Sequence, residues 1–394
     1  MTQSEVVVLS GVRTAIGDYG GGLKDKPPTE LGAAVVRESV KRAGIQPGDV
    51  EHVVFGGVIH TDVHDMYLAR VAAVNAGIPV ETPALTLNRL CGSGLQAIVS
   101  AAQTIYLGDA TAAVAGGAEV MSRSPYWLPG ARWGLRMGDG KVIDPMIGGL
   151  SDPFDDCHMG VTAENVAEKW GITRQAQDEL ALQSHQRAAA AIAAGYFKEQ
   201  ILPIESKVKG QTVVFDTDEH VKGDTTLEKL AKLRPAFKGD GTVTAGNASG
   251  INDAAAAVVL MEANEAQQRG LHPFGKLVAY AHAGVEPKYM GIGPVPAVRK
   301  VLERAKLTVK EMDVIELNEA FAAQALAVMR DLDLPLDRTN PNGSGISLGH
   351  PIGATGCILV VKALYELKRI NGKYALVSMC IGGGQGIAAI FEAM

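Results

Sequence analysis

Residues 91–117 read CGSGLQAIVSAAQTIYLGDATAAVAGG, in which a glycine-rich turn leads into a helix pattern and then into a strand pattern. Apolar side chains in residues 95–106 recur at i, i+3 and i+4 spacing, which is typical of one buried face of a helix. Gly108 follows directly, as glycine commonly does at the C-terminal end of a helix. The apolar residues 111–115 then predict a strand that runs into Gly116 and Gly117.

A second stretch repeats this order. Residues 350–384 read HPIGATGCILVVKALYELKRINGKYALVSMCIGGG, again a glycine-containing turn, an apolar helix pattern, a polar turn and a strand that runs into glycines. Two similar units in one chain indicate a duplicated fold, with one copy in each half. Chance similarity of two such elements is the alternative, and the sequence alone leaves it open.

Short apolar strands alternate with alanine-rich helices along the chain. Because strands that are apolar throughout are covered on both faces, this pattern predicts an α/β protein. The predicted strands are 6–10, 52–55, 84–88, 111–115, 276–280, 314–317 and 374–379. The predicted helices are 31–43, 93–107, 174–194, 297–305, 319–330 and 353–369.

The composition excludes several classes of protein. With 47% apolar and 20% charged residues among 394, the chain is globular and long enough for roughly two to three core-bearing units. A formal net charge of −6 disfavours binding to nucleic acid or anionic lipid, which attract cationic surfaces. No run approaches the ~20 apolar residues of a membrane span, and the first residues lack the pattern of a secretory or transit peptide. We therefore expect a cytoplasmic protein.

The region between the two halves, roughly 119–248, differs from them in composition, since it holds all three tryptophans and a polar segment at 207–238. That segment carries seven Lys or Arg residues, namely Lys207, Lys209, Lys222, Lys229, Lys232, Arg234 and Lys238. Only five acidic residues accompany them. Most such segments are solvated surface, but the local positive charge also makes this one a candidate site for a ligand that carries phosphate groups.

Cys91 stands directly after a buried strand and at the start of an apolar helix. Four cysteines without a C-x-x-C motif do not make a disulfide scaffold, so individual thiol chemistry is the better hypothesis. Helix N–H groups and the positive end of the helix dipole favour a thiolate, which predicts a lowered thiol pKa and a nucleophile. Gly92 and Gly94 leave room for a substrate carbonyl. The other interpretation is a buried structural cysteine.

The same residues also fit a dinucleotide-binding motif. Gly92, Gly94 and Ala97 match G-x-G-x-x-A, and Glu119 lies 22 residues after Ala97, where such a domain places its ribose-binding acid. This pattern predicts a nicotinamide-dependent oxidoreductase. Two points oppose it: 90 residues of α/β pattern precede the motif, and Cys91 has no role in it.

His350 and Cys380 are further candidates for chemistry. His350 lies in NPNGSGISLGHPIGATG, residues 340–356, whose glycines and prolines predict a shaped loop. Neutral imidazole is the natural base for a thiol at physiological pH. Cys380 ends a predicted strand and precedes the glycines 382–384. If the two halves correspond, the loops that carry Cys91, His350 and Cys380 converge on one pocket.

Asn318 follows the strand 314–317 and precedes a predicted helix. It is either the N-cap of that helix or a hydrogen-bond donor in the site, and the sequence leaves both interpretations open. We expect no metal site, because Cys157 and His158 are adjacent rather than spaced as ligands and no H-x-x-x-H motif occurs.

Four motifs together resemble the thiolase family, in thiolase order and over essentially the whole chain. They are LCGSGLQA at 90–97, NEAFA at 318–322, GHPIGATG at 349–356 and CIGGGQG at 380–386. The resemblance extends through HMGVTAEN at 158–165 and TAGNASG at 244–250, and within the family it is strongest to bacterial biosynthetic β-ketothiolases (acetyl-CoA acetyltransferases).

This resemblance implies a fold of duplicated α/β halves in αβαβα layers. It divides the chain into an N-terminal half at 1–118, an inserted loop domain for coenzyme A at 119–248, a return to the first half at 249–273 and a C-terminal half at 274–394. The implied activity is the reversible Claisen condensation of two acetyl-CoA, or of an acyl-CoA and acetyl-CoA, to 3-ketoacyl-CoA and CoA, with thiolysis as the reverse.

The resemblance also implies a role for each matched residue. Cys91 would be the nucleophile that becomes S-acylated, His350 would activate it, and Cys380 would move the α-proton of the second acyl-CoA. Asn318 would hold a water that stabilises the enolate oxygen together with His350. The amides of Cys91 and Gly382 would bind the oxyanion of the acyl-enzyme.

A path for coenzyme A is implied as well. The matched positions that would line it are Leu150, His158, Met159, Lys222, Phe237, Ala245, Ser249, Ala320 and Phe321. Lys222 stands where biosynthetic relatives often carry arginine, so a simple charge contact is expected there in place of a stacked or bidentate one. His158 has a second interpretation as a packed core histidine.

The residue types suit this chemistry, which needs a covalent acyl carrier, a base for a weakly acidic C–H and two oxyanion sites. No cofactor is expected beyond the coenzyme A thioesters, which are substrates, and the family implies a homodimer or homotetramer. A decarboxylating ketoacyl synthase of the same fold is a rival. That rival typically pairs its cysteine with two histidines, whereas the second reactive group here is Cys380.

Overall fold

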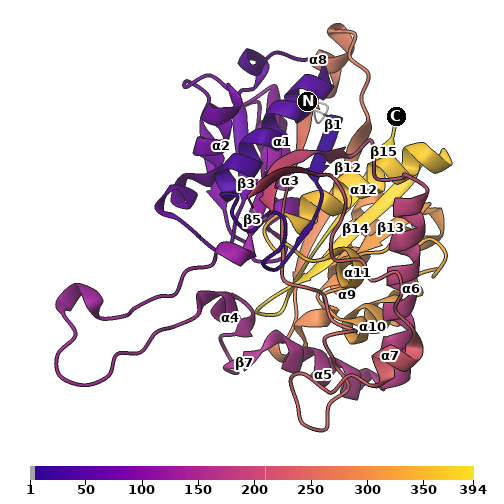
Figure 1. Ribbon diagram of the computed structural model, residues 1–394. Coiled ribbons are helices and arrows are strands. Elements are labelled where there is room, and N and C mark those ends of the chain that lie inside the picture. The colour runs from indigo at the N-terminus through magenta and orange to yellow at the C-terminus, as the bar shows by residue number, and fades with distance from the viewer. Residues whose placement is uncertain (1–4, 209) are drawn as a thin grey trace.

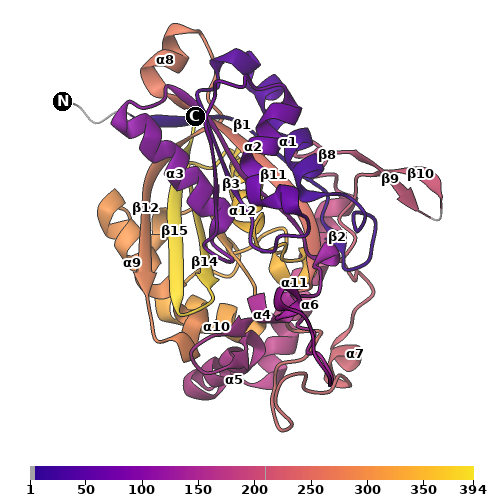
Figure 2. The ribbon, with the colours of Figure 1, turned by 90° about the vertical axis from the view of Figure 1, so that its left-hand side faces the viewer.

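The computed structural model describes residues 5–208 and 210–394. One continuous mixed sheet runs through its centre (Figures 1 and 2). Its strands follow one another in the order β13 (Val314–Leu317), β14 (Tyr374–Ile381), β15 (Gln385–Ala393), β12 (Gly275–Gly284), β1 (Val6–Thr14), β11 (Asn252–Glu262), β5 (Ala112–Val120), β3 (His52–Gly56) and β4 (Ala84–Leu87). The short strands β2 (Gly17–Asp18) and β8 (Ile201–Leu202) pair with β11 and β1.

Helices and two small hairpins complete the described chain. The helices are α1 (Pro28–Ala43), α2 (Leu68–Ala76), α3 (Ser93–Leu107), α4 (Pro145–Gly149), α5 (Met159–Trp170), α6 (Arg174–Ala193), α7 (Leu227–Ala231), α8 (Ala263–Gln268), α9 (Pro294–Ala305), α10 (Ala322–Leu332), α11 (Gly345–Leu348) and α12 (Thr355–Ile370). The hairpins pair β6 (Ser151–Asp152) with β7 (Cys157–His158) and β9 (Ile204–Val208) with β10 (Gln211–Phe215).

The central sheet consists of two similar sheets joined at their edges. In the N-terminal half, β5 runs parallel to β3 and antiparallel to β11, which is antiparallel to β1. In the C-terminal half, β14 runs parallel to β13 and antiparallel to β15, which is antiparallel to β12. Among residues 5–208 and 210–394, two pairs of β1 and β12 join the halves, namely Val7 with Lys276 and Val8 with Gly275. The duplicated order read from the sequence is therefore present in the strand pairing.

Three apolar cores define the layers. α3 and α12 pack between the two sheets, in a core that draws side chains from strands of both halves. α1 and α2 cover the outer face of the N-terminal sheet, and α9 and α10 cover the outer face of the C-terminal sheet. The order is helix, sheet, helix, sheet, helix, as the resemblance implied.

The two central helices touch through their glycines. A Cβ at Gly94 of α3 would lie 2.7 Å from the Cys357 nitrogen, and a Cβ at Gly356 of α12 would lie 2.3 Å from the Leu95 nitrogen. No side chain fits at either position, so the backbones meet directly. This contact brings together the loops that precede the two helices, and those loops carry Cys91 and His350.

The structure differs from the sequence expectation in two long strands. β11 and β15 were not predicted, although both lie inside the sheet. β11 contains the alanine-rich run 254–261, and alanine has a high intrinsic helix propensity. Burial between neighbouring strands overrides that propensity. The predicted helices match the observed ones closely for α3 and α6, while α2 and α5 were missed.

A long arm leaves the body after β5 and returns at α4 (Figure 1). Residues 124–144 form this arm, whose apolar side chains are exposed, with Trp133 at 88%. Trp127 and Ile143 exchange two backbone hydrogen bonds of 2.8 and 2.9 Å at its base. Within the described residues, no helix has the length and apolarity needed to cross a membrane.

Candidate active site

Cys91 lies on the loop between β4 and α3, two residues before the helix begins. Leu90 precedes it with a φ of +48°, a left-handed conformation that is unusual for leucine. The Cys91 side chain is half-buried and packs against an apolar cluster that includes Ile59, Met146 and Ile352. Ile59 belongs to the N-terminal half and Ile352 to the C-terminal half, so both halves meet at this thiol.

The Cys91 thiol is protonated at neutral pH. Burial raises its pKa to about 11, and the charge of Glu119 raises it further, while backbone amides of Gly382 and of Cys91 itself hydrogen-bond to the sulfur and lower it. The expectation that the helix N-terminus would lower the thiol pKa is wrong, because removal from water outweighs these amides. The binding of an oxyanion by the same two amides stays a prediction.

His350 is held by two residues that the sequence analysis did not single out. Its Nδ1 lies 2.7 Å from the Thr355 hydroxyl, which in turn lies 2.9 Å from the Pro351 carbonyl oxygen. If that hydroxyl donates to the carbonyl, Nδ1 carries the proton and Nε2 presents a lone pair. Burial lowers the His350 pKa to about 4, so the ring is a neutral base. Its backbone N–H donates to Asn252 Oδ1 at 2.9 Å.

Asn318 faces His350 rather than capping a helix. Its Nδ2 lies 3.4 Å from His350 Nε2, and its side chain is buried. Among the described residues, its Oδ1 has no hydrogen-bond partner. The N-cap interpretation is wrong, because α10 begins at Ala322, three residues later than the predicted helix start, and Phe321 occupies its N-cap position. The buried amide is instead part of the site.

Cys380 lies near the end of β14 and is fully buried. Burial and the neighbouring Cys91 thiol both raise its pKa, so it also holds its proton. Gly382 follows, and a Cβ there would lie 2.9 Å from the Met159 Cε and 3.2 Å from the Leu90 Cδ1. The backbone at Gly382 therefore packs closely between the side chains of Met159 and Leu90.

Most residues of the predicted coenzyme A path lie together beside Cys380. Met159, Ala320 and Phe321 share an apolar cluster with Cys380, and Phe237 packs against it. His158 stacks on Phe237, with ring centroids 4.6 Å apart and planes 16° apart.

The other predicted path residues are more dispersed. The Ser249 N–H donates to the Ala320 carbonyl oxygen at 2.9 Å. Leu150 packs with Cys91, and Ala245 is exposed. His158 also has a structural contact, because its Nδ1 accepts the Gly160 N–H at 3.0 Å as the N-cap of α5.

Lys222 lies at the surface and pairs with Asp18, at 3.6 Å between Nζ and Oδ2. The segment 207–238 does not form one basic patch, since Lys229 pairs with Asp224 and Lys238 with Glu168. Lys209 lies outside the described residues. The positive charge of this segment is therefore spread over several local ion pairs.

The dinucleotide-binding hypothesis fails at its two key residues. Gly94 lies against the backbone of α12, as described above, and is not open to a pyrophosphate. Glu119 is buried and accepts hydrogen bonds from three backbone amides, so it is not free to bind a ribose.

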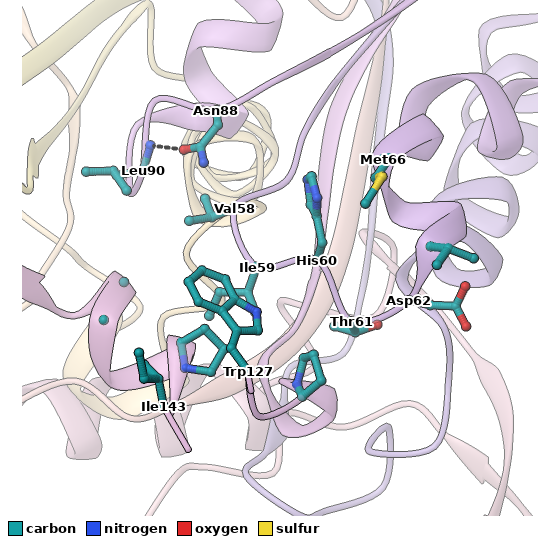
Figure 3. A pocket seen from close by; sticks show the side chains of 15 residues that line it. Val58, Ile59, His60, Thr61, Asp62, Met66, Asn88, Leu90, Trp127 and Ile143 are labelled. Atoms are coloured by element: carbon teal, nitrogen blue, oxygen red, sulfur yellow. Dashed lines mark hydrogen bonds between the residues drawn. The ribbon is translucent and has the colours of Figure 1, made fainter. Parts of the chain in front are cut away.

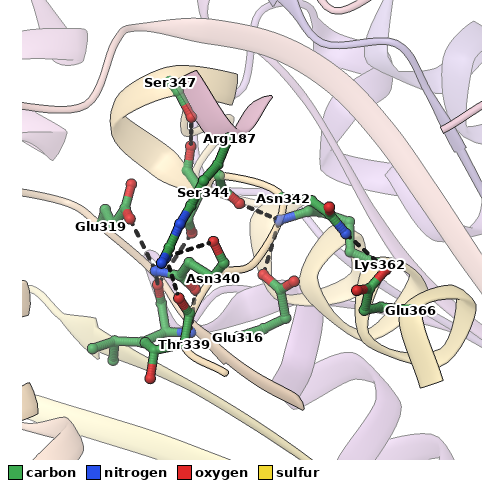
Figure 4. A network of polar contacts seen from close by, with 12 residues as sticks. Arg187, Glu316, Glu319, Thr339, Asn340, Asn342, Ser344, Ser347, Lys362 and Glu366 are labelled. Atoms are coloured by element: carbon green, nitrogen blue, oxygen red, sulfur yellow. Dashed lines mark hydrogen bonds and ion pairs between the residues drawn. The ribbon is translucent and has the colours of Figure 1, made fainter. Parts of the chain in front are cut away.

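A buried polar network supports the loop of His350 from behind (Figure 4). Lys362 of α12 donates to Glu316 Oε2 at 2.8 Å and to the Gly343 carbonyl oxygen at 2.6 Å. Asn340 bonds both backbone groups of Leu317 and donates to Glu319. The strand that leads to Asn318 is thereby fastened to the loop that leads to His350.

A cavity of about 770 Å³ lies next to the thiol loop (Figure 3). Ile59 and Leu90 line it on the side of Cys91, and Trp127 and Ile143 line it at the base of the arm. None of the residues predicted for catalysis or coenzyme A binding lines this cavity. Within the described part of the chain, no group of three His, Cys, Asp or Glu side chains is placed to hold a metal ion.

Comparison with known proteins identifies the family. Residues 6–264 match the model of the thiolase N-terminal domain, and residues 271–393 match that of the thiolase C-terminal domain. The chain belongs to the thiolase family. This thiolase is 66% identical to the beta-ketothiolase BktB of Cupriavidus necator, over 98% of this chain and 99% of that protein. It is 52% identical to an acetyl-CoA acetyltransferase of Chromobacterium violaceum, over 98% and 99%.

Solved structures agree. The Bacillus anthracis acetyl-CoA acetyltransferase superposes on this thiolase with a TM-score of 0.97 at 48% identity, covering 100% of this chain and 99% of that one. Human mitochondrial 3-ketoacyl-CoA thiolase in complex with CoA gives 0.96 at 45% identity, covering 100% and 98%. The predicted fold class is confirmed, and neither rival family is needed to account for the chain.

Proposed function

We propose that this thiolase catalyses the reversible Claisen condensation of two acetyl-CoA, or of an acyl-CoA and acetyl-CoA, through an acyl group on Cys91. The observation that carries the proposal is the close packing of the loops of Cys91 and Cys380, in which a Cβ at Gly92 would lie 2.5 Å from the Ile381 Cδ1 and a Cβ at Gly382 would lie 3.2 Å from the Leu90 Cδ1. The relatives named acetyl-CoA acetyltransferase and beta-ketothiolase support it.

In the first half-reaction the thiol proton passes to Nε2 of His350 as sulfur attacks the thioester carbonyl. The carbonyl oxygen becomes an oxyanion that the amides of Cys91 and Gly382 stabilise. When the carbonyl re-forms, the CoA thiolate leaves and takes the proton of the Cys380 thiol, which leaves Cys380 as a thiolate and His350 with the proton at Nε2. The products are the Cys91 thioester and free CoA.

In the second half-reaction the Cys380 thiolate left by the first removes the α-proton of acetyl-CoA, and the carbanion attacks the Cys91 thioester. The enolate oxygen is stabilised by His350 and by a water on Asn318, whose buried amide faces the ring. The expelled Cys91 thiolate takes its proton back from His350, Cys380 keeps the α-proton, and 3-ketoacyl-CoA is released. Thiolysis runs the same steps in reverse.

Mass spectrometry tests the assignment directly. After incubation with acetyl-CoA and an acid quench, the wild-type Cys91 peptide should carry one acetyl group, and Cys91→Ser should carry none. Cys380→Ala should still become acetylated, while condensation and thiolysis fall roughly 10²- to 10⁴-fold, the scale of a lost general acid–base group. Near wild-type thiolysis by Cys91→Ser would refute the proposal, and equal loss of acetylation and condensation in Cys380→Ala would refute the separate roles.

We further propose that the remaining matched residues, Leu150, His158, Met159, Lys222, Phe237, Ala245, Ser249, Ala320 and Phe321, line the coenzyme A path. No cofactor besides the coenzyme A thioesters takes part in this scheme, because side chains and amides of the chain perform each step. The human mitochondrial 3-ketoacyl-CoA thiolase, whose solved structure is a complex with CoA, supports the ligand class.

Assembly and location are also proposals. We propose a homodimer or homotetramer in the cytoplasm, with the domain division 1–118, 119–248, 249–273 and 274–394. The exposed apolar side chains of the arm and the exposed Leu85 on the edge strand β4 support self-association. The pairing of β11 with β5 and β1 supports assigning that segment to the first half.

A further inference from the structure

Glu119 is a buried carboxyl group that the proposed mechanism leaves without a task. It lies near the end of β5 with 1% of its surface exposed. Its Oε2 accepts the N–H of Val58 at 3.1 Å and of Gly353 at 2.8 Å, and its Oε1 accepts the N–H of Ile59 at 3.0 Å. No ion pair with Glu119 occurs among residues 5–208 and 210–394.

These three amides belong to two loops from opposite halves of the molecule. Val58 and Ile59 follow β3, whereas Gly353 follows His350 in the C-terminal half. The loops also supply Ile59 and Ile352 to the apolar cluster around Cys91. A Cβ at Gly353 would lie 2.4 Å from the Glu119 Oε2, so the loop approaches the carboxylate as closely as a glycine allows.

The surroundings of Glu119 hold little compensating charge. Burial raises its pKa to about 8, the three amides oppose this, and Asp65 on the 3₁₀ turn Val63–Tyr67 raises it further. Across β11 it faces Ala254, which does not titrate. The loop of His350 contributes one hydrogen bond to Glu119, from the Gly353 N–H. On the loop between β4 and α3, the charge of Glu119 raises the pKa of Cys91.

We propose that Glu119 is a positioning residue for this reaction: its carboxyl group fastens the loop of His350 to the loop beside Cys91, and where that group is ionised its negative charge keeps the proton on the Cys91 sulfur until His350 accepts it. The kinetic part of this inference rests on the proposed function. The electrostatic part does not, because it concerns only the reactivity of the thiol.

The test uses Glu119→Gln in the full-length protein. Glutamine keeps one acceptor oxygen but turns an NH₂ group toward a backbone N–H, so the two loops separate slightly. We expect kcat for thiolysis to fall roughly 100-fold, the scale of a 1 Å misplacement of reacting groups. KM for CoA should change by less than about threefold, because the coenzyme A path lies beside Cys380.

Alkylation of Cys91 by iodoacetamide provides a readout that a purely structural role would not give. Above pH 8 the wild-type Glu119 is charged, so Glu119→Gln should be alkylated faster, by about threefold from a larger thiolate fraction. Below pH 8 the wild-type group is protonated, and the two rates should converge. A gap that is absent at every pH, or equally large at every pH, would overturn the electrostatic role.

Two further variants separate position from charge. In Gly353→Ala the new methyl group pushes on the same contact while the carboxylate stays, so kcat should fall with a wild-type alkylation profile. Glu164→Gln is the matched control, since Glu164 is also buried and accepts the N–H groups of Thr242 and Val243. It should leave the alkylation profile unchanged.

The outcomes remain distinct from those of the proposed function. Wild-type kcat in both Glu119→Gln and Gly353→Ala would overturn the positioning role. If wild-type Cys91 fails to become acetylated by acetyl-CoA, the proposed function fails, while the pH-dependent alkylation gap still decides the effect of the Glu119 charge. Loss of folding in Glu119→Gln, detected by thermal unfolding, leaves Gly353→Ala to decide the positioning role.

Discussion

Cys91 and His350 each rest in the neutral form. Burial holds the thiol pKa near 11 and the imidazole pKa near 4, so a free thiolate and imidazolium pair is disfavoured before substrate binds. In the proposed mechanism, proton transfer from Cys91 and attack of its sulfur on the thioester are therefore coupled. An idle Cys91 reacts slowly with other electrophiles for the same reason, because the thiolate is the nucleophile.

The Thr355 hydroxyl lies within hydrogen-bond distance of both His350 Nδ1 and the Pro351 carbonyl oxygen. It accepts from Nδ1–H while Nε2 takes the thiol proton, and the same contact holds the ring in place when Nε2–H faces the enolate. Thr355→Val should therefore lower kcat by roughly 10- to 100-fold with little change in KM. Thr355→Ser should restore most of the activity. Steady-state thiolysis kinetics check this, and equal losses in both variants would contradict the hydroxyl role.

Lys222 pairs with Asp18 at the surface, so part of its charge is already compensated. Removing it should raise KM for acetyl-CoA with little effect on kcat, by at most ~1 kcal/mol in binding, and the effect should shrink as salt rises. Lys229→Ala is the control, because Lys229 is also exposed and paired within the same segment. KM for acetyl-CoA, measured at low and high ionic strength, tests this contact. An unchanged KM at low salt would show that Lys222 is a surface residue without a role in binding.

The sequence identified side chains with distinctive chemistry but not their local partners. Cys91, His350 and Cys380 stood out because each lies on a glycine-rich turn next to an apolar element. Asn252 gave no such signal, since it contacts His350 across 98 residues of chain and only the sheet brings the two together. The thiol pKa was misjudged because its burial by Ile59 and Ile352 is a tertiary effect.

Among the elements, α12 contributes most to the support of the site. It begins at Thr355, touches α3 through Gly356 and places Lys362 behind the loop of His350. Its partner Glu316 is fully buried, and burial raises the Glu316 pKa to about 7 against the effect of Lys362. Because the pKa of Glu316 is raised in the fold, this group lowers the stability of the protein most above pH 7, where the buried carboxyl must be charged.

Lys362→Met should destabilise the fold by roughly 3 to 5 kcal/mol at pH 8, because it leaves a buried carboxylate without its cation. The loss should be smaller at pH 6, where Glu316 can take a proton. Lys368→Met on the same helix is the control, since its pair with Glu199 is exposed and is worth at most ~1 kcal/mol. Denaturant unfolding at both pH values checks this, and a loss that does not grow with pH would contradict it.

The elements that sequence patterns missed are those whose identity depends on neighbours. β11 is rich in alanine and β15 begins among glycines, and neither composition favours a strand. Both are strands because β5 and β1, or β14 and β12, offer backbone groups on either side. By contrast, α3 was predicted to the residue from its spacing and its terminal Gly108.

Among the described residues, exposed apolar side chains are most concentrated on the arm at 124–144. Replacing residues 128–142 by Asn-Gly should preserve the fold, because Trp127 and Ile143 already pair as neighbours in a hairpin do. We expect the assembly to become smaller while the unfolding temperature of the protomer changes little. Light scattering during size-exclusion chromatography measures the mass, and an unchanged mass would contradict a role of the arm in assembly. Trp133→Gln alone is the milder companion variant.

At this scale the duplication was the feature most accessible from sequence. The two stretches 91–117 and 350–384 indicated it, and the strand pairing repeats in both halves. The junction between the halves, through Val7 and Val8 on one side, carried no pattern that residue types reveal. How two copies of a motif dock depends on surface shape rather than on local periodicity.

The placement of one site across two docked halves also has a consequence for protein synthesis. During synthesis Cys91 emerges from the ribosome early, whereas His350, Cys380 and Gly382 emerge only with the second half of the chain. A nascent chain therefore exposes Cys91 without the groups that the proposed function places around it. In a cell rich in acyl thioesters, the cysteine gains its specific reactivity only when α12 and β14 have closed over it.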